Sequence, residues 1–115
     1  VGANLASAPR DVEYPATSLA ESGAAGATPS AALAGFARHF ARWLAAWEQQ
    51  GFAPIRTAWL DGASGLGGPV RVRLEQATLD GRFLDLDADG ALLLEAAGVR
   101  RRIAAGEIFP ATAAG

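Results

Sequence analysis

Cysteine, lysine and methionine are missing from this chain of 115 residues, and histidine occurs once. The lack of cysteine excludes disulfides and cysteine-ligated metal sites, although it leaves the redox compartment open. All ten cationic residues are arginine, so no lysine of this chain can form a Schiff base or act as a catalytic ammonium group. Because the chain starts at Val1 and contains no methionine, we expect that an upstream portion of the protein is missing.

The sequence also has no long apolar run and little net charge. No segment approaches the roughly 20 apolar residues that cross a bilayer, and no charged-then-apolar N-terminal segment indicates a signal peptide. The formal net charge of −2 gives no long-range attraction to nucleic acid or to an anionic membrane. We therefore expect a soluble, cytoplasmic protein without a membrane partner.

The first half of the chain is expected to contain a strand end, a loop and two helices. Residues 1–5 form a short apolar run typical of a strand end, and the residues after them are rich in Pro, Gly, Ser and Thr. From residue 30 to 50, large apolar side chains recur at helical spacing. Thr28 is placed to cap this helix and Gly51 to end it. A shorter helix is predicted at 54–60.

After residue 65 the pattern changes to the period of a strand. Residues 70–75 alternate between apolar and charged, which predicts a half-buried strand. Further strands are predicted at 78–86, 91–96 and 99–104. Turn signals lie between or within these strands, at 80–81, 89–90 and 97–98. Short strands so closely spaced suggest a small β-barrel that hides its sheet edges by closure.

Residues 85–90 match the Asp-x-Asp-x-Asp-Gly opening of a calcium-binding EF-hand loop. The twelfth position of such a loop should be a bidentate glutamate, but Ala96 stands there and Glu95 comes one residue early. Residues 91–95 also favour a strand over a flanking helix. We therefore predict an acidic strand end that turns through Asp-Gly, without a bound metal.

Two further clusters invite a phosphate-binding interpretation. A glycine-rich stretch at 62–68 lacks the Gly-Lys-Ser/Thr of a P-loop and leads into a strand through Pro69, which favours a flexible linker. The three arginines at 100–102 have the guanidinium forks that match phosphate. However, consecutive strand residues point to opposite faces, and no aromatic residues are interleaved as in a single-strand nucleic-acid site. A solvated strand face is the favoured interpretation.

The remaining chemical groups give weaker signals. His39 has no carboxylate or serine at a spacing that indicates catalysis, so we expect a surface residue. The three tryptophans are expected to pack between elements. Gly106 and Glu107 follow the last predicted strand. Such a glycine allows close backbone approach, and the carboxylate can accept from an amine or a ribose hydroxyl.

Taken in order, several segments resemble the biotin protein ligase family. VGANL at 1–5 is similar to the family's Gly-Ile-Gly-Ile-Asn strand, YPATSL at 14–19 to its Ala-Thr-Ser-Leu segment, and GEI at 106–108 to its closing Gly-Glu-hydrophobic signature. Residues 33–59 resemble the late helix pair of the family, and residues 68–72 resemble the opening of its C-terminal domain. Residues 85–94 resemble a hairpin of that domain. The resemblance covers essentially the whole chain.

This resemblance implies the fold class and the two domains. The fold class is α+β: a strand and helix-pair remnant of the ligase catalytic domain, followed by a small SH3-like β-barrel. The expected domains are 1–65, the C-terminal part of the catalytic domain, and 66–115, the SH3-like C-terminal domain. The catalytic domain of the family makes biotinyl-adenylate from biotin and ATP, then passes biotin to a lysine of an acceptor domain.

The resemblance also implies site residues, substrates and partners. Asn4 would face the adenine, with Gly2 giving a close approach. Ala16 and Thr17 would lie at the wall of the adenine pocket. Glu107 would lie where the barrel meets the nucleotide site. ATP and biotin are then substrates, Mg²⁺ accompanies ATP, and the acceptor partner is a biotin carboxyl carrier protein.

The chain departs from the family in three respects. The Arg/Gly-rich loop for biotin and phosphate is absent, and so is the lysine that stabilises charge on the reacting phosphate. The aromatic residue that some members carry near the adenine is Ala16 here. The first two features are expected upstream of Val1, in a missing N-terminal catalytic portion. The catalytic residues are therefore expected outside this chain, which alone is predicted neither to activate nor to transfer biotin.

Two other functions stay open. The protein could be ligase-like and bind nucleotide or biotin without transferring it, or the barrel could be a non-enzymatic SH3-like interaction module. A homodimer is compatible with the sequence. DNA would be a partner only if a helix-turn-helix domain lies upstream.

Overall fold

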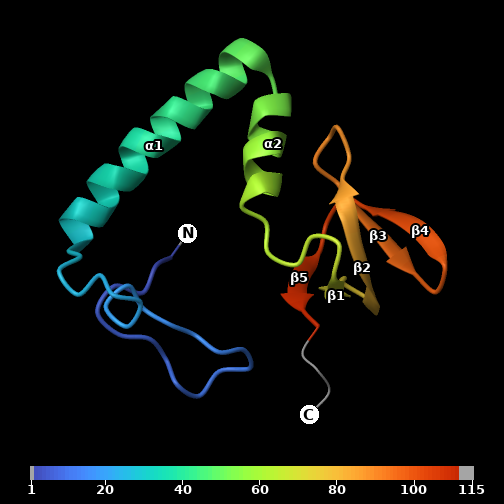
Figure 1. Cartoon of the computed structure of the whole chain (residues 1–115), viewed down its shortest axis with the longest axis horizontal. Coiled ribbons are helices and arrows are strands. Elements are labelled where there is room, and N and C mark those ends of the chain that lie inside the picture. The colour runs from blue at the N-terminus through green and yellow to red at the C-terminus, as the bar shows by residue number, and fades with distance from the viewer. Residues whose placement is uncertain (1, 112–115) are drawn as a thin grey trace. The chain divides into compact units, whose positions relative to one another are not determined.

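The computed structural model describes residues 2–111 (Figure 1). The chain forms two compact units, and the boundary between them falls within the long helix. The units are Val1–Leu44 and Ala45–Gly115. This division concerns compactness alone. The domain boundary at 65 and 66 stays a prediction.

The first unit begins with a loop rather than the predicted strand. The backbone N–H groups of Leu19 and Ala20 donate to the carbonyl oxygens of Asn4 and Leu5, at 3.0 and 2.9 Å. Residues 2–5 join no sheet, and Val1 lies outside the described residues. The strand prediction is wrong for residues 2–5, because an apolar run forms a regular strand only where a neighbouring strand continues the hydrogen-bonded ladder.

Helix α1 (Pro29–Gln50) begins and ends where the sequence predicts. The hydroxyl of Thr28 accepts from the backbone N–H of Ala31 at 3.2 Å, which caps one of the free donors of the first turn. At the other end, Gly51 takes a φ of 77° and donates to the carbonyl of Trp47 at 2.8 Å. That left-handed conformation is the one glycine adopts without strain at a helix C-terminus.

No residue of α1 is buried in this chain. Its large apolar side chains form the helical stripe that the sequence predicts, but they remain accessible: Leu33 is 67% exposed and Phe40 56%. Phe36 and Phe40 stack on each other along the stripe, with ring centroids 5.7 Å apart. Within residues 2–111, neither helix is long and apolar enough to cross a membrane.

Helix α2 (Ala53–Asp61) packs on the sheet of the second unit. The Trp59 ring lies against Phe83, with centroids 6.0 Å apart. Arg56 donates to the backbone carbonyl of Leu86 from Nε and Nη2, at 3.0 and 2.7 Å. Nη2 also binds the Asp85 carboxylate at 3.0 Å. These contacts attach the helix to the end of one strand through both apolar and charged groups.

The second unit contains one antiparallel sheet of five strands, in the order β4-β3-β2-β1-β5 (Figure 1). The strands are β1 (Pro69–Arg73), β2 (Thr78–Leu86), β3 (Leu92–Ala96), β4 (Val99–Ile103) and β5 (Glu107–Pro110). The predicted α+β class is confirmed. The first four strands lie within about two residues of their predicted bounds.

The apolar positions of alternate strand residues form the core of the sheet unit. Val72, Phe83 and Leu94 are at most 1% exposed. Burying side chains of this size stabilises a fold by roughly 1.5–3 kcal/mol each. In β2 the strict alternation is broken, because the pairing with β3 shifts between Phe83 and Asp85. The extra residue of this bulge allows Phe83 and Leu86 to face the same core although they are three residues apart.

Two features of the sheet differ from the sequence prediction. Residues 80–81 are no turn: Gly81 lies inside β2, and its φ is not positive. A Cβ added there would come within 2.5 Å of the Glu95 carbonyl oxygen and 2.9 Å of the Leu94 side chain. The glycine is therefore needed because β3 approaches closely. The second difference is β5, which lies after the last predicted strand and pairs with β1.

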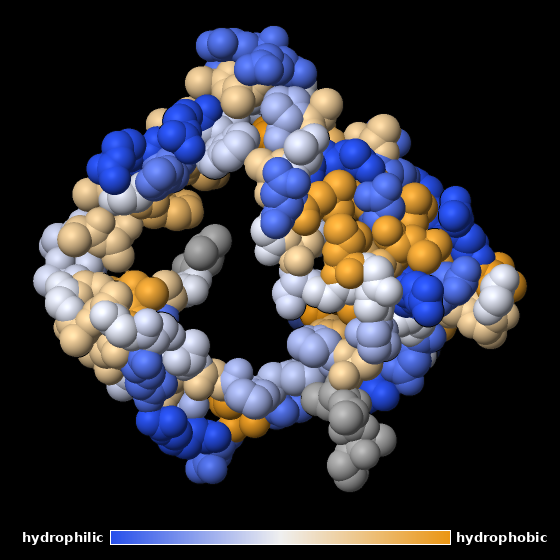
Figure 2. All heavy atoms as spheres, in the orientation of Figure 1, coloured by the Kyte–Doolittle hydropathy of each residue, from blue (hydrophilic) through white to orange (hydrophobic). Residues whose placement is uncertain are grey.

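The hydrogen-bonded ladder is open, with β4 and β5 as its edges within residues 2–111. Ile103 of β4 and Ile108 of β5 nevertheless line one cavity, so the sheet curls and brings its two edges to the same pocket. Within the described residues the ladder thus stays open, and both of its edge strands contribute apolar side chains to this cavity. In the view of Figure 2, hydrophobic residues gather beside α2 over this unit, bordered by hydrophilic ones.

The turns that join β2, β3 and β4 follow the sequence signals. Gly90 has a φ of 88°, and Ala97 and Gly98 form a two-residue hairpin loop with φ of 51° and 75°. Before Gly90, the Asp87 carboxylate accepts from the backbone N–H groups of Asp89 and Ala91, both at 2.9 Å. Its other oxygen accepts from Arg102 of β4. The hydrogen bond from Arg102 lowers the pKa of Asp87 below its ordinary value of 3.8, against an opposing effect of desolvation.

We predict that Gly81→Ala destabilises the sheet unit. The methyl group would overlap backbone and core atoms of β3, and overpacking of this kind costs about 1–3 kcal/mol. Urea unfolding followed by tryptophan fluorescence and circular dichroism measures the change. Gly35→Ala is the matched control, because Gly35 lies in α1 with no atom within 4 Å of the added group. Equal unfolding midpoints for Gly81→Ala and the wild type would contradict the close approach.

We also predict that the stabilising effect of Arg102 depends on pH. The pKa of Asp87 is lowered in the folded state, so its contribution is present above the ordinary value of 3.8. It is lost as the pH falls through the lower pKa of the folded protein. The difference in urea midpoint between the wild type and Arg102→Gln should be largest near about pH 6 and shrink in acid. A difference that does not change with pH would contradict the pairing. Arg82→Gln is the control, since Arg82 has no described partner.

Candidate functional site

The structure brings Asn4 and Thr17 together in the first unit. The Asn4 side-chain amide donates to the Thr17 carbonyl oxygen at 3.2 Å. The same region is held by the backbone bond from Leu19 to the Asn4 carbonyl. Asn4 is exposed, and its amide oxygen accepts no hydrogen bond within residues 2–111. One half of the amide therefore fixes the loop, while the other half is accessible to a ligand that donates.

Two further predicted residues flank this pair. Ala16 is half-buried next to Thr17, and Gly2 is exposed with open space where a side chain would be. Gly2 therefore serves no close contact within residues 2–44. The role assigned to it by resemblance, close approach to a nucleotide, stays a prediction.

Ser18 is a residue of this loop that the sequence analysis missed. It is the one buried polar side chain among the described residues, with 2% exposed. Its hydroxyl accepts from the backbone N–H of Glu21 at 3.2 Å. The Glu21 carboxylate binds Arg10, and the Thr17 hydroxyl lies 3.4 Å from it. The pattern Ser-x-x-Glu, known from helix N-termini, was the available signal for this turn.

Glu107 and Gly106 lie in the second unit, at the start of β5. Glu107 is exposed and pairs with Arg73 of β1 in the ladder. A Cβ on Gly106 would lie 3.1 Å from the Arg73 carbonyl oxygen and 3.0 Å from the Leu74 side chain. The Arg73 guanidinium lies over the Phe109 ring, 4.7 Å from its centroid. Gly106 thus lets β5 approach β1 closely and leaves the adjacent carboxylate at the surface.

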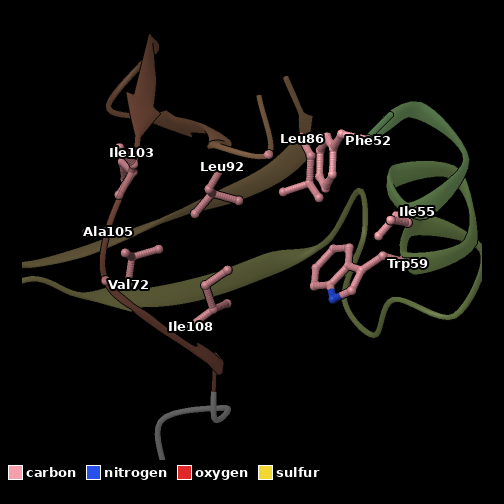
Figure 3. Close-up of a pocket in the computed structure, with 12 residues that line it drawn as sticks. Phe52, Ile55, Trp59, Val72, Leu86, Leu92, Ile103, Ala105 and Ile108 are labelled. Carbon is pink, nitrogen blue, oxygen red and sulfur yellow. The ribbon is translucent and has the colours of Figure 1, made fainter. Parts of the chain in front are cut away.

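A cavity of about 330 Å³ opens between α2 and the curled sheet (Figure 3). Figure 3 shows Ile55 and Trp59 on the helix side, with Leu92, Ile103 and Ile108 on the sheet side. None of the residues that line it is titratable. The cavity can therefore hold an apolar group, but it offers no acid, base or nucleophile.

The carboxylates of the acidic motif at 85–90 bind other groups of the same unit. Asp85 accepts from Arg56 and from its neighbouring backbone N–H, and Asp87 holds the turn and binds Arg102. Asp89 lies 3.6 Å from Arg102. Their oxygens therefore bind guanidinium and backbone donors. Across residues 2–111, no three acidic, histidine or cysteine side chains gather as a metal site.

The other sequence clusters are likewise structural. The glycine-rich linker pairs with β2, where Gly67 donates to the Phe83 carbonyl and Phe83 donates to that of Gly68, at 2.7 and 3.0 Å. His39 is exposed on α1, as predicted. The predicted nucleotide residues are distributed over both units: Asn4, Ala16 and Thr17 belong to the first and Glu107 to the second.

Two family models match the chain in succession. Residues 1–61 match the biotin/lipoate A/B protein ligase family, and residues 65–109 match the biotin protein ligase C terminal domain. The matched regions cover both the loop with Asn4 and the sheet with its cavity.

Individual relatives agree with these models. The biotin–[acetyl-CoA-carboxylase] ligase of Paracoccus denitrificans is 37% identical over 125 residues, which cover 95% of this chain and 48% of that protein. The apo structure of biotin protein ligase from Aquifex aeolicus has a TM-score of 0.79 at 18% identity, covering 95% of this chain and 49% of that one. A crystal structure of the same enzyme gives 0.76 at 19% identity, covering 93% and 48%.

The chain thus spans about half the length of the relatives that it matches. The likeness to the solved structures supports the fold. The assignment to a protein family rests on the family model over residues 1–61 and on the identity to the ligase of Paracoccus denitrificans. The chain belongs to the biotin/lipoate A/B protein ligase family, and its residues 65–109 match the biotin protein ligase C terminal domain.

Proposed function

We propose that this chain is part of an ATP-dependent biotin protein ligase that forms biotinyl-adenylate and transfers biotin to a lysine of an acceptor domain. The observation that carries the proposal is the 37% identity to a biotin–[acetyl-CoA-carboxylase] ligase across 95% of this chain. The succession of the two family models, each over its own part of the chain, supports the same assignment.

The groups present here suit a supporting role in nucleotide binding. The accessible half of the Asn4 amide can accept from an adenine amine, and its bond to the Thr17 carbonyl holds it in place. Glu107, exposed at the start of β5, can accept from a ribose hydroxyl or an amine. We assign Ala16 and Thr17 to the wall of the adenine pocket, and Gly2 to a position where the nucleotide approaches the backbone closely.

The chemistry of activation needs groups from elsewhere in the protein. Adenylation develops negative charge on phosphate, and a preorganised cation stabilises it. The chain contains no lysine to fill this role. Mg²⁺ would arrive with the ATP phosphates, as is usual for this ion. We therefore propose that the catalytic cation and the biotin pocket belong to the portion that the relatives carry beyond the matched region.

The proposed acceptor is a biotin carboxyl carrier protein, in line with the acetyl-CoA-carboxylase that the name of the Paracoccus denitrificans ligase gives as its substrate. A protein that consumes ATP and modifies a metabolic carrier would act in the cytoplasm. The alternative is a ligase-like protein that binds nucleotide or biotin but does not transfer biotin to an acceptor.

We predict that the 115-residue chain alone gives no biotin-dependent ATP–pyrophosphate exchange and no labelled acceptor. A polypeptide that also contains the remaining half of the ligase should give both. Adenylate formation by the chain alone would contradict the assignment of the reacting groups to the rest of the protein. A longer polypeptide that binds biotin but labels no acceptor lysine would support the ligase-like alternative.

We further predict that Asn4→Ala and Glu107→Ala each weaken ATP binding by the longer polypeptide by about tenfold, because each removes one hydrogen bond of roughly 1–1.5 kcal/mol. Isothermal titration with ATP measures the affinity. Gln49→Ala and Glu48→Ala are matched controls, since both side chains are exposed on α1 and outside the proposed site. A variant with unchanged affinity would remove its residue from the nucleotide site.

A further inference from the structure

The free edge of β4 is the most cationic strand edge of the sheet. β4 pairs with β3 on one side only, so on the other side half of its backbone N–H and C=O groups have no strand partner. Arg100 and Arg101 are exposed on this strand. Within residues 2–111 neither of these side chains makes a hydrogen bond or ion pair, whereas the Arg102 side chain is already held by Asp87 and Asp89.

The register of β4 places the two available arginines on different faces. Residues directly opposite each other in an antiparallel pair share one face of the sheet. Arg101 lies opposite the buried Leu94, so it leaves the sheet on the core side at the open edge. Arg100 lies opposite Glu95, on the outer side. The strand therefore presents a positive charge above and below its free backbone groups.

The apolar cavity lies at the C-terminal end of the same strand. Ile103, the last residue of β4, lies opposite Leu92 on the core side, and both line the cavity between α2 and the sheet (Figure 3). Val99, at the other end of β4, is on the same side and 56% exposed. On the core side of the edge, an apolar side chain (Val99) is followed by a cationic one (Arg101) and then by another apolar one (Ile103).

We propose that the free edge of β4 binds an extended, acidic segment of a partner protein by strand addition, with one apolar side chain of that segment seated in the cavity beside Ile103. For an antiparallel partner, the pattern of the edge specifies an apolar residue opposite Ile103, carboxylates opposite Arg101 and Arg100, and a second apolar residue opposite Val99. The bound segment would thus follow the order apolar, any residue, acidic, acidic, apolar.

The charge of β4 favours an acidic segment over a second copy of the same strand. A second copy of β4 would bring three arginines against three, so pairing of the same edge between two copies is repelled. The opposite edge, β5, ends in Pro110 and begins with Glu107, which suits an acidic strand poorly. Peptide addition to a sheet edge draws affinity from the main chain and specificity from side-chain pockets. Both are available at β4, and neither depends on the ligase reaction.

The test uses a fluorescently labelled, capped peptide, Thr-Ile-Thr-Glu-Glu-Val-Thr, titrated with the 115-residue chain at low ionic strength. We expect saturable anisotropy and shifts of β4 amide resonances. Arg100→Gln and Arg101→Gln should each raise the dissociation constant by up to about fivefold, which is the upper range for an exposed ion pair. Arg82→Gln, on an interior strand of the same sheet, should leave the dissociation constant unchanged.

Three peptide variants separate strand addition from simple charge attraction. N-methylation of alternate residues on the pairing edge should weaken binding at least about tenfold, because it removes backbone donors. Replacing the isoleucine with alanine should weaken binding through the cavity, and replacing both glutamates with glutamine should weaken it through Arg100 and Arg101. Absence of saturable binding would overturn the proposal. Binding that N-methylation leaves intact, or that both arginine variants leave unchanged, would overturn it equally.

Discussion

Burial of one face of the five-stranded sheet is the constraint on which the rest of the second unit depends. Val72, Phe83 and Leu94, from three neighbouring strands, are almost fully removed from solvent. The alternation of side chains fixes the register, because a slip of one residue would exchange the buried face for the charged one. The bulge between Phe83 and Asp85 and the missing side chain of Gly81 adjust the strands locally so that this face stays continuous.

The core face in turn positions α2. Trp59 extends the apolar contact to Phe83, and Arg56 binds the carbonyl of Leu86, which ends β2. A cationic group bonded to a backbone carbonyl and a carboxylate forms shorter and stronger hydrogen bonds than a neutral donor would. Between the helix and the sheet this arrangement leaves the apolar cavity, whose lining contains no charge. The charged pair of Arg56 and Asp85 lies outside this lining.

Within the described residues, the acidic and polar motifs of the sequence make contacts that stabilise the fold. The aspartates at 85 and 87 hold an arginine each and stabilise a turn. The Asn4 amide ties two parts of a loop together, and Gly106 allows two strands to meet. In the proposed ligase, the same contacts would keep Asn4 and Glu107 in fixed positions before a nucleotide arrives, which reduces the ordering cost of binding.

Much of the architecture was predictable because its signals are local. Thr28 and Gly51 mark the ends of α1, the alternation from residue 70 marks a sheet, and Ala97 with Gly98 marks a hairpin. Capping, strand period and turn conformation depend on residues that are neighbours in the chain, so the sequence contains them directly.

The sequence by itself therefore determined the helices, most strands and the family resemblance carried by ordered motifs. The tertiary structure alone decided that Gly81 lies within a strand, that residues after Gly106 form β5 and that residues 2–5 do not form a regular strand. It also decided that Ser18 is buried and that Arg100 and Arg101 stand at a free edge. Each of these depends on which distant segment comes to lie alongside, and that pairing is fixed by packing across the whole unit rather than by the residues next in sequence.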